Sequence, residues 1–176
     1  VYCAVDTSVH PYNFYEAAAY RESIKEAISD YVLSIGGRSL VLFMSHAELR
    51  YTYGQLEQEF IKAGILPIQQ NGTSLDKIEE FRRVEESVLF GVDRFWAGVD
   101  FPGPTLSQVI IVKAPNPAIK NPVISHRRVY EDDFMNATYG NIGAMKLRQG
   151  FGRLIRKIDD RGAVIILDSR YQARFQ

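Results

Sequence analysis

The chain has 176 residues with 21 basic and 21 acidic side chains, so its formal net charge is zero and any nucleic-acid site on it must be a local patch. This length is enough for one domain with its own core, which we assign to residues 1–176. The single cysteine, Cys3, excludes a disulfide framework and a cysteine cluster for zinc or iron–sulfur, and it fits a cytoplasmic setting. No apolar run reaches membrane-spanning length, so no membrane partner is expected.

Helical and extended patterns alternate along the chain. The first helix is expected over 14–37, where helix formers end at a Gly pair. The run RSLVLFMS that follows, 38–45, is typical of a strand buried on both faces. Further helices are predicted over 46–64, 74–84 and 144–159, and further strands over 65–70, 87–92, 107–113 and 162–168. This order predicts an α/β fold with a doubly wound, mainly parallel sheet flanked by helices.

Two long connections interrupt this alternation, over 93–106 and 114–143. Long connections are uncommon in compact α/β domains and are often functional. Each one starts at the carboxyl end of a predicted strand, where open α/β sheets bind ligands. Both are therefore candidate sites, although the mixed charges of the second assign it neither to nucleic-acid contact nor to packing.

A segment with two arginines, QGFGRLIR at 149–156, is the first specific candidate. On a helical wheel Gln149, Arg153 and Arg156 share one face. The opposite face is an apolar stripe of Leu147, Phe151, Leu154, Ile155 and Ile158. Adjacent guanidinium groups repel each other unless an anion lies between them, and a triphosphate suits their planar donors. Each glycine costs about 1 kcal/mol inside a helix, which favours close approach by a ligand; an ordinary solvated helix face accounts for the spacing equally well.

Two segments at strand ends offer further candidates. In AGVDFPGPTL, Gly98 and Asp100 precede a Pro-Gly-Pro turn. The carboxylate is placed to orient an arginine or hold a water, although a turn-stabilising Asp is the more common case. Phe95 and Trp96, just before them, are suited either to stack on bases or to pack against the core.

Ser45 follows a predicted buried strand and opens a predicted helix. A serine in that position is first of all an N-cap, and the same helix end offers free amides to a phosphate. His46 follows it, but the three histidines, His10, His46 and His126, show no metal-ligand spacing, and no metal site is expected.

The chain lacks the motifs that hold a nucleotide. There is no G-x-x-x-x-G-K-[ST] loop and no acidic pair at the end of an apolar strand for Mg²⁺. The arginines are suited to phosphate, but the chain supplies neither the loop nor the metal ligands that a complete nucleotide site needs.

Three segments, in chain order, resemble motifs of the second RecA-like motor domain of superfamily 2 DNA helicases, in the DinG/XPD-like branch. LVLFMSHAELRYTYGQL (40–56) is similar to motif IV. LFGVDRFWAGVDFPGPTLSQVIIVKAPNP (89–117) is similar to motif V with the strand and loop after it, and QGFGRLIRKIDDRGAVIILDSRY (149–171) to motif VI with the turn and strand after it. The resemblance covers nearly the whole chain, with Met44 where threonine is usual and Asn116 where phenylalanine is frequent.

The resemblance implies a role for each matching residue. The two arginines would reach the γ-phosphate of ATP, and Gln149 would be catalytic together with them. Residues expected at the nucleotide or in its coupling are Arg153, Arg156, Gln149, Gly98, Asp100 and Gly152. Residues expected near single-stranded DNA are Ser45, His46 and Trp96.

In this family the first RecA-like lobe holds ATP and Mg²⁺ and, in many members, an iron–sulfur cluster. The chain, which begins at Val1, is then expected to be a fragment of an ATP-dependent DNA helicase of DNA repair, inactive alone. Its partners would be single-stranded DNA and the first lobe. One alternative is a catalytically incomplete nucleic-acid-binding module of a DinG-like protein. Another is an unrelated α/β domain in which Arg153 and Arg156 pair with Asp159 or Asp160.

Overall fold

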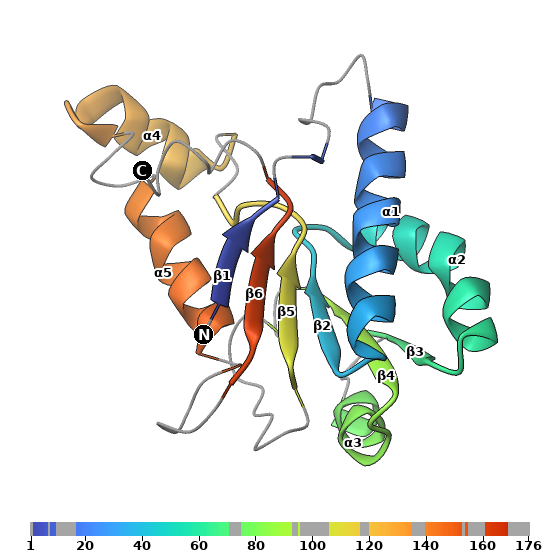
Figure 1. Ribbon diagram of the computed structural model, residues 1–176. Coiled ribbons are helices and arrows are strands. Elements are labelled where there is room, and N and C mark those ends of the chain that lie inside the picture. The colour runs from blue at the N-terminus through green and yellow to red at the C-terminus, as the bar shows by residue number, and fades with distance from the viewer. Residues whose placement is uncertain are drawn as a thin grey trace.

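The computed structural model describes residues 2–6, 8–9, 17–70, 75–92, 95, 106–116, 120–134, 140–152, 154 and 161–168. Its centre is a six-stranded sheet in the order β1-β6-β5-β2-β4-β3 (Figure 1). The strands are β1 (Tyr2–Val5), β2 (Ser39–Leu42), β3 (Leu66–Gln69), β4 (Ser87–Gly91), β5 (Gln108–Ile111) and β6 (Ala163–Ile166). The helices are α1 (Ala17–Ile35), α2 (His46–Lys62), α3 (Leu75–Arg83), α4 (Pro122–Tyr130) and α5 (Asn141–Phe151).

Both faces of the central strands β2, β4 and β5 are fully buried, as expected for the interior of a parallel sheet. Alternate residues of β2 point to opposite sides: Val41 and Phe43 join a core with α1 and α2, whereas Leu40 and Leu42 join a core with α3 and α5. The strands β4, β5 and β6 divide their residues between the two cores in the same way. The doubly wound parallel architecture expected from the sequence is therefore confirmed.

All strand pairings in the sheet are parallel, so the carboxyl ends of the strands meet at one edge. The chain leaves β2 toward β3 on one side and leaves β5 toward β6 on the other. The strand order thus reverses between β2 and β5, and the carboxyl edge there is the usual place for a ligand in such sheets.

A glycine turn aligns β2 with its neighbours after α1 ends. Gly36 and Gly37 have φ values of 73° and 107°, and Arg38 has a φ of 48°. A side chain on Gly37 would place its Cβ 2.7 Å from the backbone nitrogen of Ser87 at the start of β4. Glycine is required at this position both for its backbone conformation and for the close approach of β4.

The elements predicted from the sequence are present within the described residues, with shorter limits and one substantive difference. The helix predicted over 144–159 begins at Asn141 and ends at Phe151. Gly152 is its C-cap, with its N–H donating to Arg148 at 2.9 Å, so the prediction of one helix through the arginines was wrong. Leu147 and Leu154 of the predicted apolar stripe are both buried in the α3/α5 core.

The sequence reading missed β1 and α4. The strand β1 is short and half exposed at the sheet edge, and Ile124 is the buried residue of α4. Neither element therefore carries a clear apolar period. The helix α4 depends on its cap instead, because the Asn121 side chain accepts from the N–H groups of Val123 and Ile124. No helix in the described part of the chain is long and apolar enough to cross a membrane.

Replacing Gly37 with alanine is expected to destabilise the domain. The strained φ alone costs roughly 1–3 kcal/mol, and the contact with the Ser87 nitrogen adds to it. Gly54→Ala is the matched control, because Gly54 lies inside α2 with no atom within 4 Å of the added Cβ, and it should stabilise by about 0.5–1 kcal/mol. Urea unfolding of both variants tests this, and equal stabilities would contradict the assigned turn.

Candidate functional site

Ser45 caps α2 at the carboxyl end of β2. Its backbone is extended (φ −146°, ψ 145°), and its hydroxyl accepts from the N–H of Glu48 at 3.2 Å. The capping role expected from the sequence is therefore confirmed. Ser45 and His46 are both exposed, and the first amides of α2 open onto the same edge of the sheet.

Lys113 follows β5, whereas Ser45 follows β2. The two residues therefore lie on either side of the point where the strand order reverses, called here the switch point. Its Nζ lies 3.3 Å from Oε1 of Glu48 and 4.7 Å from the ring centroid of Tyr20. The side chains of Lys113 and Glu48 are only 21% and 16% exposed, so this is a partly desolvated ion pair. The pair joins the end of β5 to the first turn of α2 and holds the ammonium over an aromatic face.

Asp168 joins the segments that leave β5 and β6. It follows β6, is 6% exposed, and its Oδ2 accepts from the N–H of Ala114 at 3.0 Å. Gln70, after β3, similarly accepts from the N–H of Val92 at 2.6 Å. Both are polar residues within two positions of a strand's end, and the sequence-based prediction did not single out either of them.

Asp6 forms the corresponding tie after β1. It accepts from the backbone N–H of Ser8 at 2.9 Å, from the Ser8 hydroxyl at 2.6 Å and from the Tyr31 hydroxyl at 3.0 Å. Burial acts to raise the pKa of Asp6, but these hydrogen bonds outweigh it and the pKa lies below its usual value. Burial, together with the bond to Asp6, raises the pKa of Tyr31 to about 12, so the phenol stays protonated at neutral pH and donates this hydrogen bond.

A cavity of about 290 Å³ lies beside Ser45 at the carboxyl edge. It is lined by Ala17, Tyr20, Arg21, Ser45, Ala47, Glu48, Tyr51 and Lys113. These residues come from the start of α1, the start of α2 and the end of β5. The cavity thus combines cations, tyrosine rings and a capped helix end at the switch point, and we name it the Arg21–Tyr51 hollow.

Gln149 and Gly152, from the arginine segment, do not lie at this edge. Both are exposed in the last turn and cap of α5, and Figure 1 shows that end of α5 beside the start of β1. A Cβ on Gly162, just before β6, would lie 2.6 Å from both Leu154 and the carbonyl oxygen of Ser107. Leu154 therefore packs at the amino edge of the sheet. Ser45 and His46 thus lie at the carboxyl edge of the sheet, whereas Gln149 and Gly152 lie near its amino edge.

The remaining predicted positions lie outside the described residues. They are Arg153, Arg156, Gly98, Asp100 and Trp96. Phe95 is described: it is fully buried, and a Cβ on Gly91 would lie 2.6 Å from its ring. The packing role weighed for Phe95 is therefore correct, and stacking on a base is not open to it.

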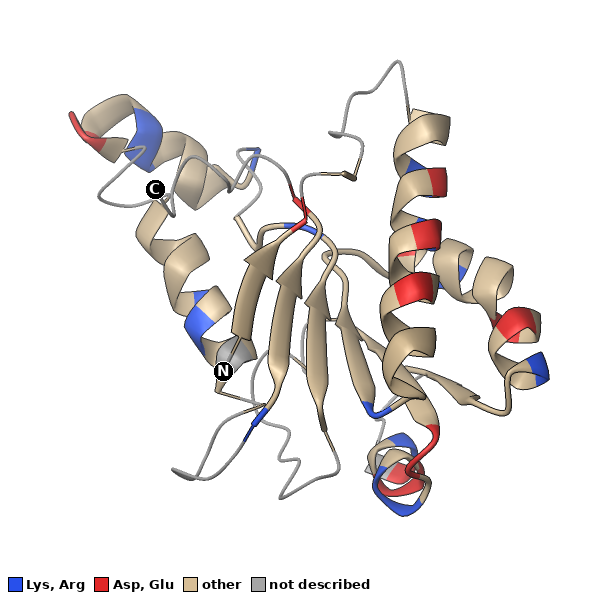
Figure 2. Ribbon diagram, in the orientation of Figure 1, with Lys and Arg blue, Asp and Glu red and all other residues tan. Residues whose placement is uncertain are grey.

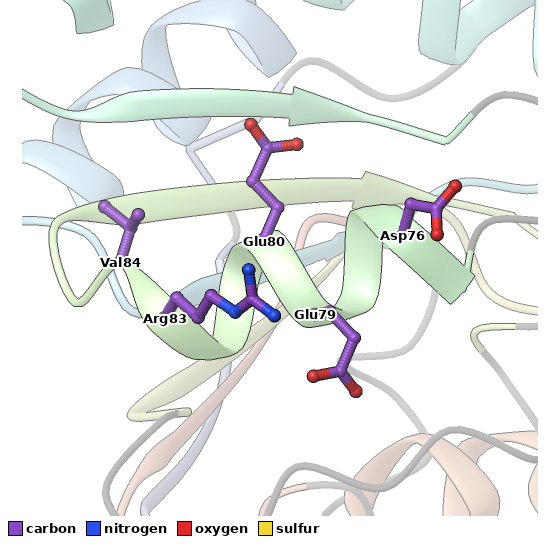
Figure 3. A pocket seen from close by; sticks show the side chains of 5 residues that line it. All are labelled: Asp76, Glu79, Glu80, Arg83 and Val84. Atoms are coloured by element: carbon purple, nitrogen blue, oxygen red, sulfur yellow. The ribbon is translucent and has the colours of Figure 1, made fainter.

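Two other hollows are weaker candidates for a binding site. The first, about 400 Å³, is lined by α3 and the residue after it, as Figure 3 shows. Its Glu79 and Glu80 already pair with Arg82 and Lys77 of the same helix. The second, about 480 Å³, lies around Asp6 and the acidic face of α1. No group of three or more His, Cys, Asp or Glu in the described part of the chain is arranged to hold a metal ion.

Comparison with known proteins identifies the family of this domain. Residues 28–175 match a family model described as the helicase C-terminal domain. The ATP-dependent helicase DinG of Mycobacterium tuberculosis (strain H37Ra) is 35% identical over 148 residues, which is 81% of this chain. The chain belongs to the helicase C-terminal domain family, in its DinG/XPD-like branch.

The chain covers only a small part of the length of these relatives. The chain spans 22% of the M. tuberculosis DinG protein and 15% of the 3′-5′ exonuclease DinG of Bacillus subtilis, which is 34% identical over 139 residues and covers 74% of this chain. A solved XPD helicase shares the fold with a TM-score of 0.73 at 17% identity, over 99% of this chain and 32% of that one. The sheet is therefore a RecA-like helicase domain, as the resemblance implied.

Removing the Asp168 carboxylate should destabilise this helicase domain. Asp168→Ala leaves the buried N–H of Ala114 without its acceptor, which costs about 1–3 kcal/mol. Asp168→Asn keeps an oxygen at that position and should lose less. Thermal or urea unfolding compares the two variants, and a wild-type stability for Asp168→Ala would show that the tie contributes nothing.

Proposed function

We propose that the chain is the C-terminal motor lobe of an ATP-dependent DinG-like DNA helicase. In this proposal the first RecA-like lobe of the parent protein holds ATP and Mg²⁺, and this lobe adds arginines on one side and part of the DNA track on another. The single observation that carries the proposal is the family match, because it runs over 28–175 and so includes all three motif-like segments in order.

The environment of Gly152 supports a nucleotide at the end of α5. Its backbone is ordinary right-handed (φ −64°, ψ −8°), and a Cβ there would meet only the backbone oxygens of Arg148 and Gln149, at 3.4 and 3.5 Å. Nothing among the described residues requires glycine at this exposed position. Close approach of a phosphate to the backbone is a physical reason for glycine here, and Arg153 follows directly.

The proposed chemistry is positioning and charge stabilisation. Arg153 and Arg156 would stabilise the negative charge that develops on the transferred γ-phosphoryl group, with Gln149 beside them. ATP binding would close the cleft between the lobes, and hydrolysis would reopen it while the DNA strand is held at the carboxyl edge near Ser45 and His46. Gly98, Asp100 and Trp96, in the connection after β4, would link the two sites.

Arg153→Ala in the intact parent protein tests the arginine role. We expect the DNA-stimulated ATP hydrolysis rate to fall by about 10³–10⁵-fold, the usual effect of an arginine finger, with ATP and DNA binding retained. Arg153→Lys should recover little, because lysine lacks the planar fork of donors. Arg148→Ala, an exposed arginine of α5, is the control and should retain activity. A rate for Arg153→Ala within a few fold of wild type would refute the role.

Gly152→Ala separates function from stability at the same site. Alanine suits this backbone and should stabilise the folded domain by up to about 1 kcal/mol. The added methyl group should nevertheless displace the nucleotide and lower the ATP hydrolysis rate of the parent by about 10- to 100-fold. Unfolding and ATPase assays on one preparation measure both, and unchanged activity would contradict a close nucleotide.

A nucleic-acid clamp without motor activity is the second candidate. It is supported by the B. subtilis relative, whose name is that of an exonuclease. The parent sequence distinguishes the two, because a motor needs a Walker A lysine and an acidic Mg²⁺ site in the first lobe. A parent that binds DNA but hydrolyses no ATP would establish the clamp.

A further inference from the structure

We propose that the Arg21–Tyr51 hollow binds one nucleotide of single-stranded DNA, with its base stacked on the Arg21–Tyr51 pair and its phosphate at the Arg21 guanidinium. This inference rests on the proposed DNA-binding function and deepens it. It adds Arg21 of α1, which lies outside the three motif-like segments, and Tyr51 of α2, which was not among the residues expected near single-stranded DNA. The hollow is near the lower limit of small-ligand cavities, about 300 Å³.

Arg21 and Tyr51 form a cation–π pair on the wall of the hollow. The guanidinium carbon of Arg21 lies 4.9 Å from the centroid of the Tyr51 ring, and Tyr51 is 45% exposed. Single-stranded nucleic acids bind to surfaces of this kind, because every base has a π-face that stacks on an aromatic ring or a guanidinium plane. A platform that is exposed and already held together by its own contact needs little ordering when a base arrives.

Among the described residues that line the hollow, Arg21 is the cation available to a phosphate. Lys113 is paired with Glu48 and lies over Tyr20, so this part of the wall is neutral and fixed. No carboxylate of the described residues forms an ion pair with Arg21. The described residues that line the hollow therefore carry a net positive charge from Arg21, beside the exposed Ser45 hydroxyl.

The neighbouring surface of α1 restricts the path of a DNA strand. Glu22, Glu26 and Asp30 are exposed along one face of α1, and Figure 2 shows acidic residues following one another along that helix. A polyanion is repelled from this face. The strand is thereby kept at the carboxyl edge, where the hollow opens between the starts of α1 and α2.

The test is binding of a fluorescein-labelled oligothymidine to the intact parent protein, followed by anisotropy at several salt concentrations. Tyr51→Ala should weaken binding by about 5- to 50-fold, because one base loses its stacking partner, with the salt dependence unchanged. Tyr51→Phe should bind within about twofold of wild type, since the ring is kept. Arg21→Gln should reduce the slope of log K against log salt by about 0.7, the value for one phosphate contact on a single strand.

Arg50→Gln is the matched control, because Arg50 is exposed on α2 next to Tyr51 but does not line the hollow; it should leave the slope unchanged. Wild-type affinity and slope for both Tyr51→Ala and Arg21→Gln overturn the inference while leaving the helicase proposal intact. ATP that displaces the oligonucleotide from wild type but not from Tyr51→Ala assigns the hollow to free nucleotide and also overturns it. A wild-type parent that does not bind the oligonucleotide refutes the proposed function itself.

Discussion

The parallel direction of all six strands is the constraint on which the rest of the structure depends. A parallel sheet needs crossover helices, and these bury both of its faces. Function is thus left to the two edges where strands begin and end. Polar ties such as Asp168 to Ala114 and Gln70 to the Val92 amide fix the segments that leave the carboxyl edge.

The same constraint separates the two candidate regions of the domain. Ser45 and the Arg21–Tyr51 hollow lie where strands end, whereas α5 runs back and delivers Gly152 and Leu154 to where strands begin. The motor lobe that we propose would have two tasks, contact with a nucleotide and contact with a strand of nucleic acid. An arrangement with one candidate region at each edge allows both contacts at once without competition for the same surface.

Local chemistry could be predicted from the sequence, whereas long-range pairing could not. The strand after Arg38 and the cap at Ser45 depend on neighbours in the chain, and both were predicted correctly. The Asp168–Ala114 bond joins residues 54 positions apart. The hollow combines two helix starts with a strand end. Neither could be predicted from a local sequence pattern. The prediction of a single helix over 144–159 was wrong because α5 ends at Phe151 with Gly152 as its C-cap, and apolar periodicity does not indicate where a helix is capped. The arginines themselves stay a prediction.

The strand β6 has a mechanical consequence. It starts beside the packed Leu154, ends at Asp168, and is hydrogen-bonded to β1 on one side and β5 on the other. A tightly packed layer of this kind deforms little. A displacement of the start of β6 is therefore expected to move the whole strand, whose far end is joined to the Ala114 N–H through Asp168. In the proposed motor lobe, a step would therefore be expected as rotation of the whole body rather than as bending within β6.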